Sequence, residues 1–124
     1  MKLHPDFFQI KDIRQTATGL DYTLALNPEH PIYQAHFPGN PITPGVCIIQ
    51  IVKELLEVQL KCKLFLKKVN NAKFLNVINP LENREVVFAV STSSAGDDAH
   101  KVSVVVSREN QQFAKLVLLF VDRV

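Results

Sequence analysis

The chain has 124 residues, of which 47% are hydrophobic and 21% are charged, and its formal net charge at pH 7 is +2. This length suits one domain with a real core but not two, so we expect a single domain over residues 1–124. The small net charge, with no dense run of lysine or arginine, argues against a nucleic-acid partner or a basic membrane-binding tail.

The first ten residues lack the apolar core of a secretory signal, and the longest apolar run, residues 116–121, is too short to span a bilayer. We therefore expect no membrane association. Cys47 and Cys62 fall at the two ends of an expected helix, roughly 22 Å apart, which is beyond disulfide reach. Reduced thiols and a cytoplasmic location are predicted.

Two strands are expected at the start of the chain. Residues 7–16 form the first, a turn follows near Gly19, and residues 21–26 alternate apolar and polar side chains as a second strand. The turn cluster at residues 27–31 ends this strand. Residues 36–45 then combine one histidine, three prolines and two glycines, which predicts a stiff loop.

A long helix is expected over residues 44–61. Thr43 is a favourable N-cap and Pro44 suits the first helical position. Apolar residues surround most of this helix, so we expect other structure to enclose it. Its polar residues share one stripe because they recur at three- and four-residue spacing: Gln50, Lys53, Glu54, Glu57 and Lys61.

The rest of the chain reads as strands. The segments are residues 64–77 with a bulge or bend near Asn70 and Asn71, then residues 85–92, 101–107 and 113–122. Antiparallel strands and one apolar helix are most economically arranged as a sheet curled around the helix, an α+β fold. One sheet cannot cover every side of the helix, so a dimer is expected.

The sequence HFPGNPITPGV at residues 36–46 resembles the active-site signature of the hot-dog-fold 3-hydroxyacyl-acyl-carrier-protein dehydratases of fatty acid synthesis. Residues 31–35, and residues 73–75 followed by Pro80, fit the same family. The resemblance implies a hot-dog fold and a lyase that removes water from a 3-hydroxyacyl thioester, giving a trans-2-enoyl thioester in fatty acid or related lipid or polyketide synthesis. It implies an acyl carrier protein as the bearer of the thioester, and no metal or organic cofactor.

The resemblance also assigns roles to residues. His36 would remove the proton at C2, and the Gly45 N–H would polarise the thioester carbonyl. These assignments agree with the chemistry, because histidine titrates near neutral pH and an N–H in the first helical turn has no intrahelical acceptor. The residues expected to bind substrate, along an acyl tunnel between subunits, are Phe37, Pro38, Gly39, Ile42, Val46 and Ile49.

The family places a carboxylic acid on the neighbouring subunit's helix, fourteen residues after its histidine, where this chain has Gln50. Glutamine is no proton donor at ordinary pH. Glu54 lies one turn further on the same face, so our hypothesis is that it donates the proton, directly or through Gln50 or a water. The alternative is that Glu54 belongs to a solvated stripe that includes an ion pair between Glu57 and Lys61.

Other residues have simpler explanations. His30 and His36 lack a cysteine or acidic partner at ligand spacing, so no zinc site is expected. Cys47 is expected to be a small core residue rather than a nucleophile. Asn40 fits a turn before the next proline, and Phe37 fits either the acyl channel or core packing.

Lysines gather after the helix. They would attract an acidic carrier protein or, equally, protect an exposed strand from aggregation. The lysines concerned are Lys61, Lys63, Lys67, Lys68 and Lys73.

Three functional hypotheses follow. The first is a dehydratase that forms a homodimer or a trimer of dimers. The second is a non-catalytic acyl-binding or partner subunit, paired in a heterodimer with a paralogue that carries the missing acid. The third is a hot-dog thioesterase, which would need an activated water that no acidic residue of the loop is placed to supply.

Overall fold

The computed structural model describes residues 2–35 and 39–123. Its strands end within three residues of the positions expected from the sequence. The elements in chain order are β1 (Phe8–Gln15), β2 (Leu20–Leu26), α1 (Pro31–Ala35), α2 (Gly45–Leu60), β3 (Leu64–Phe74), β4 (Glu85–Ser94), β5 (Ala99–Arg108) and β6 (Gln111–Asp122).

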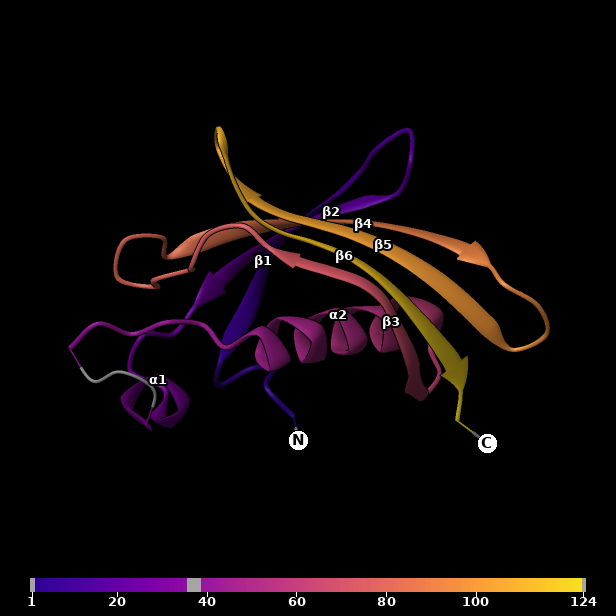
Figure 1. Cartoon of the computed structure of the whole chain (residues 1–124), viewed down its shortest axis with the longest axis horizontal. Helices are drawn as coiled ribbons and strands as arrows, with labels where there is room; N and C mark the ends of the chain where they lie inside the picture. The colour runs from indigo at the N-terminus through magenta and orange to yellow at the C-terminus, as the bar shows by residue number, and fades with distance from the viewer. Residues whose placement is uncertain (1, 36–38, 124) are drawn as a thin grey trace.

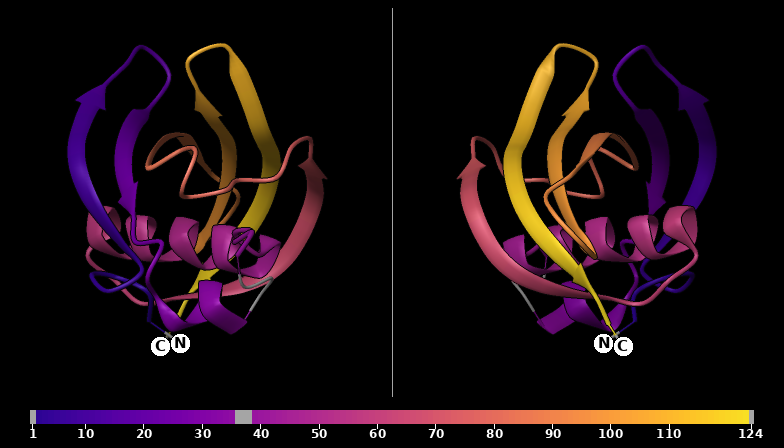
Figure 2. Two further views of the ribbon diagram at one scale, coloured as in Figure 1. Left: turned by 90° about the vertical axis from the view of Figure 1, so that its left-hand side faces the viewer. Right: turned by 90° about the vertical axis from the view of Figure 1, so that its right-hand side faces the viewer.

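The strands form one six-stranded sheet in the order β1-β2-β4-β5-β6-β3, and every pairing is antiparallel. The sheet arches over α2, which runs beneath its concave face, and both chain ends lie on this helix side (Figure 1). In two further views, α2 runs across the picture below the sheet, and the outer strands β1 and β3 curve down toward it on opposite sides (Figure 2). The expected α+β arrangement, a curled sheet around one helix, is confirmed.

The core lies between the concave face of the sheet and α2. Alternate residues of β4 and β5 point inward, as the two-residue period of a half-buried strand requires. The inward apolar residues of α2 meet them and are almost completely shielded from solvent. The central core residues include Val86, Phe88, Val102, Val104, Ile51, Val52, Leu55 and Leu56.

The start of α2 differs from the prediction. The N-cap residue is Pro44 rather than Thr43, and no side chain caps the helix. The Pro44 carbonyl accepts hydrogen bonds from the N–H groups of Cys47 and Ile48. Thr43 does not cap the helix because its hydroxyl is hydrogen-bonded to Tyr33 instead.

The short helix α1 was not anticipated from the sequence. It starts at Pro31, a residue well suited to a first helical turn, inside the segment that we expected to be only a turn. His30 Nδ1 accepts a hydrogen bond from the Ile32 N–H at 3.0 Å, which satisfies one of the first N–H groups of the helix. In Figure 1, α1 lies beyond the N-terminal end of α2.

β3 is an edge strand, and its register shifts twice against β6, once between Leu66 and Lys68 and once between Val69 and Asn71. The second shift confirms the irregularity expected near Asn71. Apart from Leu64, every residue of β3 is exposed. Within the described residues, no helix is long and apolar enough to cross a membrane.

Candidate functional site

The expected site divides between described and undescribed residues. His36, Phe37 and Pro38 lie outside the described residues, so the roles expected for them remain predictions. The structure does describe the residues on both sides of them. The described part of the site comprises the start of α2, the polar side chains along α2 and the cavity that they line.

Gly45 is the first residue of α2. Between described residues, no hydrogen bond is donated by its N–H, as expected for a first-turn amide. A Cβ at this position would lie 2.8 Å from Cζ of Phe74, so the ring packs directly over the glycine. Because it lies in the first turn, the Gly45 N–H adds to the positive end of the helix dipole, where negative charge on a ligand oxygen would be stabilised.

Tyr33 and Thr43 meet just ahead of α2. The Tyr33 hydroxyl is 2.7 Å from Oγ1 of Thr43, and both residues are buried. Burial raises the pKa of Tyr33, so its hydroxyl stays protonated across the range in which a histidine titrates. The sequence offered no signal for this contact, because Tyr33 was expected only to lead into the loop.

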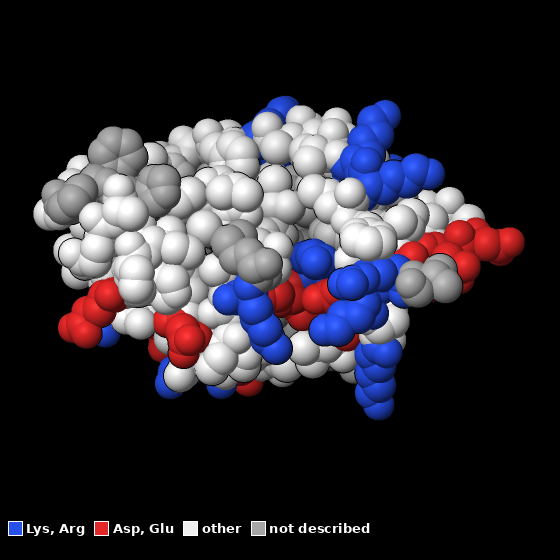
Figure 3. All heavy atoms as spheres, turned by 90° about the horizontal axis from the view of Figure 1, so that it is seen from below, with Lys and Arg blue, Asp and Glu red and all other residues white. Residues whose placement is uncertain are grey.

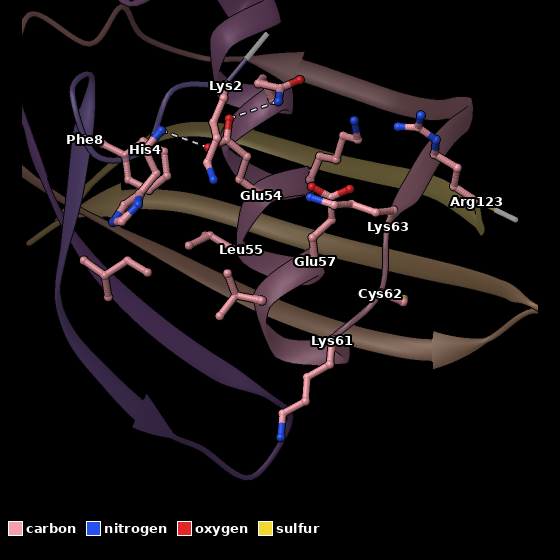
Figure 4. A pocket seen from close by; sticks show the side chains of 14 residues that line it. Lys2, His4, Phe8, Glu54, Leu55, Glu57, Lys61, Cys62, Lys63 and Arg123 are labelled. Carbon is pink, nitrogen blue, oxygen red and sulfur yellow. Dashed lines mark hydrogen bonds between the residues drawn. The ribbon is translucent and has the colours of Figure 1, made fainter.

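Glu54 is buried, with only 8% of its surface exposed. Oε2 accepts hydrogen bonds from the Leu3 N–H at 2.8 Å and from Nε2 of Gln50 at 3.0 Å, while Oε1 accepts one from the His4 N–H at 2.9 Å. Figure 4 shows the Glu54 side chain turned toward His4 in the N-terminal segment. The alternative that Glu54 belongs to a solvated stripe is wrong, because the N-terminal segment covers this carboxylate.

The bond to Glu54 orients Gln50. Its amide nitrogen points toward the carboxylate one turn along α2, so its amide plane is fixed relative to the helix. Two donors on Oε2 and one on Oε1 suit an ionised carboxylate, which is purely an acceptor. This geometry favours Glu54 as the group that holds Gln50 and the N-terminal segment in place.

The expected ion pair between Glu57 and Lys61 is also absent among the described residues. Oε2 of Glu57 instead accepts a hydrogen bond from the Leu64 N–H at 2.9 Å, joining α2 to the start of β3. Lys61 has a left-handed backbone, with φ of 55°, and ends the helix. A left-handed residue is a common way for a helix to end.

The expected substrate-binding residues that the structure describes lie near the start of α2. Ile42 and Ile49 are half-buried, whereas Val46 is 65% exposed although it belongs to the central helix. Gly39 is exposed and has φ of 86°, a conformation that favours glycine. Asn40 accepts a hydrogen bond from the side chain of Asn79 at 3.3 Å, which ties this turn to the segment before β4.

A cavity of about 620 Å³ lies along the outer face of α2, between the N-terminal segment and the end of the chain. Its lining includes Gln50 and Glu54, with Phe8 and Leu55 on its apolar side (Figure 4). Lysine and arginine side chains gather over this face of the molecule (Figure 3). The cationic residues that line the cavity form no ion pair with another described residue. They are Lys2, Lys53, Lys61, Lys63 and Arg123.

Both cysteines are free, as expected, and Cys47 is buried in the core. Burial, and next the Asp122 carboxylate, raise the pKa of Cys62, which makes its thiol a poor nucleophile. His100 Nε2 lies 2.8 Å from the same carboxylate and lowers the pKa of Asp122 through their hydrogen bond. The part of the chain that the structure describes contains no cluster of three metal-ligating side chains.

Comparisons with known proteins bear on the family and the fold of the chain. The ApeI-like family model, described as ApeI dehydratase, matches residues 12–116. The 3-hydroxyacyl-(acyl-carrier-protein) dehydratase FabZ of Caulobacter vibrioides is 41% identical over 59 residues, covering 40% of this chain and 37% of that relative's length. FabZ of Rickettsia massiliae is 22% identical over 120 residues, covering 90% of this chain and 81% of the relative.

A solved structure has the same fold. It is described as the dehydratase heterocomplex ApeI:P from Xenorhabdus doucetiae, and it matches with a TM-score of 0.71 and 17% identity over 91% of this chain and 96% of that chain. The fold is therefore the hot-dog fold implied by the resemblance. With a family match that extends from β1 to β6, the chain belongs to the ApeI-like family of dehydratases.

Proposed function

We propose that this chain eliminates water from a 3-hydroxyacyl thioester to give a trans-2-enoyl thioester, in fatty acid or related lipid or polyketide synthesis. The observation that carries the proposal is the start of α2. An amide without a backbone acceptor among the described residues lies at Gly45, nine residues after His36, within the segment matched by the family. That amide is suited to stabilise the thioester oxygen as it gains negative charge.

His36 would act as the base at C2, and the atoms of the elimination balance without a redox partner. The C2–H and C3–O bonds break, the C2–C3 double bond forms, and the hydroxide needs a proton to leave as water. Gln50 cannot supply that proton. The proton that His36 has taken from C2 can meet this need, with the Gln50 amide orienting the hydroxyl and Glu54 orienting Gln50.

An acyl carrier protein is the proposed bearer of the substrate. The curated relatives named above are dehydratases of carrier-bound substrates by name. The cationic side chains along the cavity of α2 would attract an acidic protein and speed its encounter with the enzyme. With both thiols free, we propose that the protein works in the reducing cytoplasm.

β3 is the proposed contact with a second subunit. Its outer edge offers unpaired backbone groups, and apolar side chains are exposed along it, among them Phe65 at 54% and Phe74 at 50%. Val46 of α2 is exposed as well, and it follows directly after Gly45. A partner strand added to β3 would extend the sheet and approach the start of α2, either as a homodimer or as a unit of a trimer of dimers.

A second candidate function is favoured by one finding, the description of the structural neighbour as a heterocomplex. In this alternative, the chain supplies the His36 loop and a hot-dog paralogue supplies a carboxylic acid to the shared site. The glutamine at position 50 fits such a division, because the missing acid would come from the partner. The chain alone would then bind acyl thioesters with little turnover.

The test of the first proposal uses the purified chain and a 3-hydroxyacyl carrier thioester, with enoyl formation followed by absorbance and mass spectrometry. We expect turnover in the wild type and a loss of about a hundredfold or more in His36→Ala, since general bases contribute about 10²- to 10⁴-fold. Lys101→Ala, on an exposed position of β5, is the control. Undiminished turnover in His36→Ala would remove the histidine from its role.

The heterodimer is tested by adding an acid to the chain itself. Gln50→Glu places a carboxylic acid at the family position, so a chain that lacks only this acid should gain turnover without a partner. If the wild type is inactive alone but active with a co-expressed acid-bearing paralogue, the second candidate replaces the first. Inactivity of the wild type in both settings would contradict both candidates.

A further inference from the structure

Two buried side chains, one in α1 and one just ahead of α2, bind each other. The Tyr33 hydroxyl and Oγ1 of Thr43 are 2.7 Å apart, Tyr33 is completely buried, and Thr43 is 6% exposed. One side-chain hydrogen bond thus connects two residues that are ten positions apart in the sequence. His36 lies between these two residues in the sequence.

Each of the two residues is also attached to the body of the molecule. The Tyr33 ring stacks on Phe7 with centroids 4.9 Å apart and an interplanar angle of 15°, and its N–H donates to the His30 carbonyl at 2.9 Å. The Thr43 N–H donates to the carbonyl of Ile78 at 2.9 Å. The hydrogen bond therefore joins two anchored points rather than two mobile side chains.

Chain connectivity links this bond to the proposed chemistry. His36 follows Tyr33 by three residues, and Gly45 follows Thr43 by two. The threonine hydroxyl is committed to Tyr33, so it cannot cap the helix that Gly45 begins. The chain thus lacks the N-cap interaction usual for threonine and has a tertiary contact in its place.

We propose that Tyr33 and Thr43 are positioning residues, whose hydrogen bond fixes the start of α2, and with it the Gly45 N–H, relative to α1, the described element that directly precedes His36 in the sequence. This inference rests on the proposed function. A base and an oxyanion donor must face the same substrate, and a displacement of about 1 Å between them can cost up to about a hundredfold in rate. The bond acts on this geometry without touching the substrate.

The test compares variants that remove or keep one hydroxyl. Thr43→Val keeps the shape of the side chain and removes the hydroxyl, while Thr43→Ser keeps the hydroxyl. We expect Thr43→Val and Tyr33→Phe each to lower kcat by about tenfold with KM changed by less than about twofold, and Thr43→Ser to stay close to the wild type. The double variant should be no worse than the single ones, because both partners are then gone.

Tyr22→Phe is the matched control. It removes another tyrosine hydroxyl, which donates to Oε1 of Gln59 at 3.0 Å, but it does so near the opposite end of α2. We expect Tyr22→Phe to lower thermal stability while leaving kcat and KM unchanged. The inference is overturned if Thr43→Val lowers stability as Tyr22→Phe does and leaves kcat at the wild-type value.

Amide hydrogen exchange separates this inference from the proposed function. In Thr43→Val, exchange in residues 39–46 should be faster than in the wild type and in Thr43→Ser, with β4 and β5 unchanged. If the wild type shows no turnover, the proposed function fails, and the exchange measurement alone decides whether the bond holds residues 39–46 in place. Equal exchange rates in all three proteins would contradict the inference.

Discussion

The start of α2 and its second half are held by different chemistry. Around the start, the contacts are neutral: a tyrosine–threonine hydrogen bond, a phenyl ring over a glycine, and Thr43 bonded to a backbone carbonyl. In the second half, carboxylates dominate, since Glu54 and Glu57 together accept three backbone N–H groups. One end of the helix is fixed by packing and hydroxyls, the other by charge.

This difference separates the proposed chemistry from the groups that stabilise the helix by charge. The neutral contacts next to Gly45 do not change ionisation over the range in which a histidine takes and returns a proton. The carboxylates lie further along α2, where they tie the N-terminal segment and β3 to the helix. Substitutions in the second half should therefore act mainly on stability, and those at the start on turnover.

Glu54→Ala is expected to have the largest effect on stability. It leaves the buried Leu3 N–H and the half-buried His4 N–H without their acceptor, and an unsatisfied buried donor costs about 1–3 kcal/mol. We expect the free energy of unfolding to fall by about 3 kcal/mol, measured by urea denaturation. Glu82→Ala, at an exposed carboxylate, is the control and should change it by less than about 0.5 kcal/mol.

The same variant tests whether the second half of α2 is only structural. At a temperature where Glu54→Ala remains folded, its kcat should fall modestly, because Gln50 loses the group that orients it. A complete loss of turnover in folded Glu54→Ala would instead favour Glu54 as the proton donor. That result would contradict the view that the second half of α2 acts mainly on stability.

Gly45→Ala should have the second-largest effect on stability. It should lower turnover more than Glu54→Ala does. The new Cβ would lie 2.8 Å from Cζ of Phe74, so the half-exposed ring must move, at a cost of about 1 kcal/mol. We expect activity to fall as well, because the displaced ring and the methyl group crowd the Gly45 N–H. Phe74→Leu in the same chain should restore stability, and an unchanged melting temperature in Gly45→Ala alone would contradict the close packing.

His100→Ala should have the smallest effect, confined to the dependence of stability on pH. The hydrogen bond from His100 lowers the pKa of Asp122, so this carboxylate adds stability above its unfolded pKa and loses it as pH falls through the folded value. Without His100, the melting temperature should fall less steeply from about pH 7 to about pH 3. Arg14→Ala, which breaks the exposed pair with Asp21, is the control.

Much of the fold could be predicted from local patterns. The alternation in β2, the strand-like composition of β4 and β5 and the apolar content of α2 predicted the sheet and the helix, and the irregular strand at Asn71 was expected from its composition. Each of these signals depends on neighbours within about four residues, where side-chain periodicity is informative. The start of β6 and the end of β3 moved by only a few residues.

The site was less predictable because its contacts are distant in sequence. Thr43 satisfied the local rule for an N-cap, yet a tyrosine ten residues earlier takes its hydroxyl. Glu54 looked like part of a solvated stripe, yet backbone groups fifty residues away cover it. Local rules describe what a residue can do, and tertiary contacts decide which of these options is used.

The exposed edge of β3 has a consequence for the life of the protein in a cell. A strand with open backbone groups and protruding phenylalanines such as Phe65 is a surface on which newly made chains stick to one another or to chaperones. The exposed lysines along β3, such as Lys67 and Lys68, are of the kind that discourages edge-to-edge association. A second subunit paired with β3, as proposed above, would remove this surface, so the yield of folded protein should depend on how quickly each new chain finds its partner.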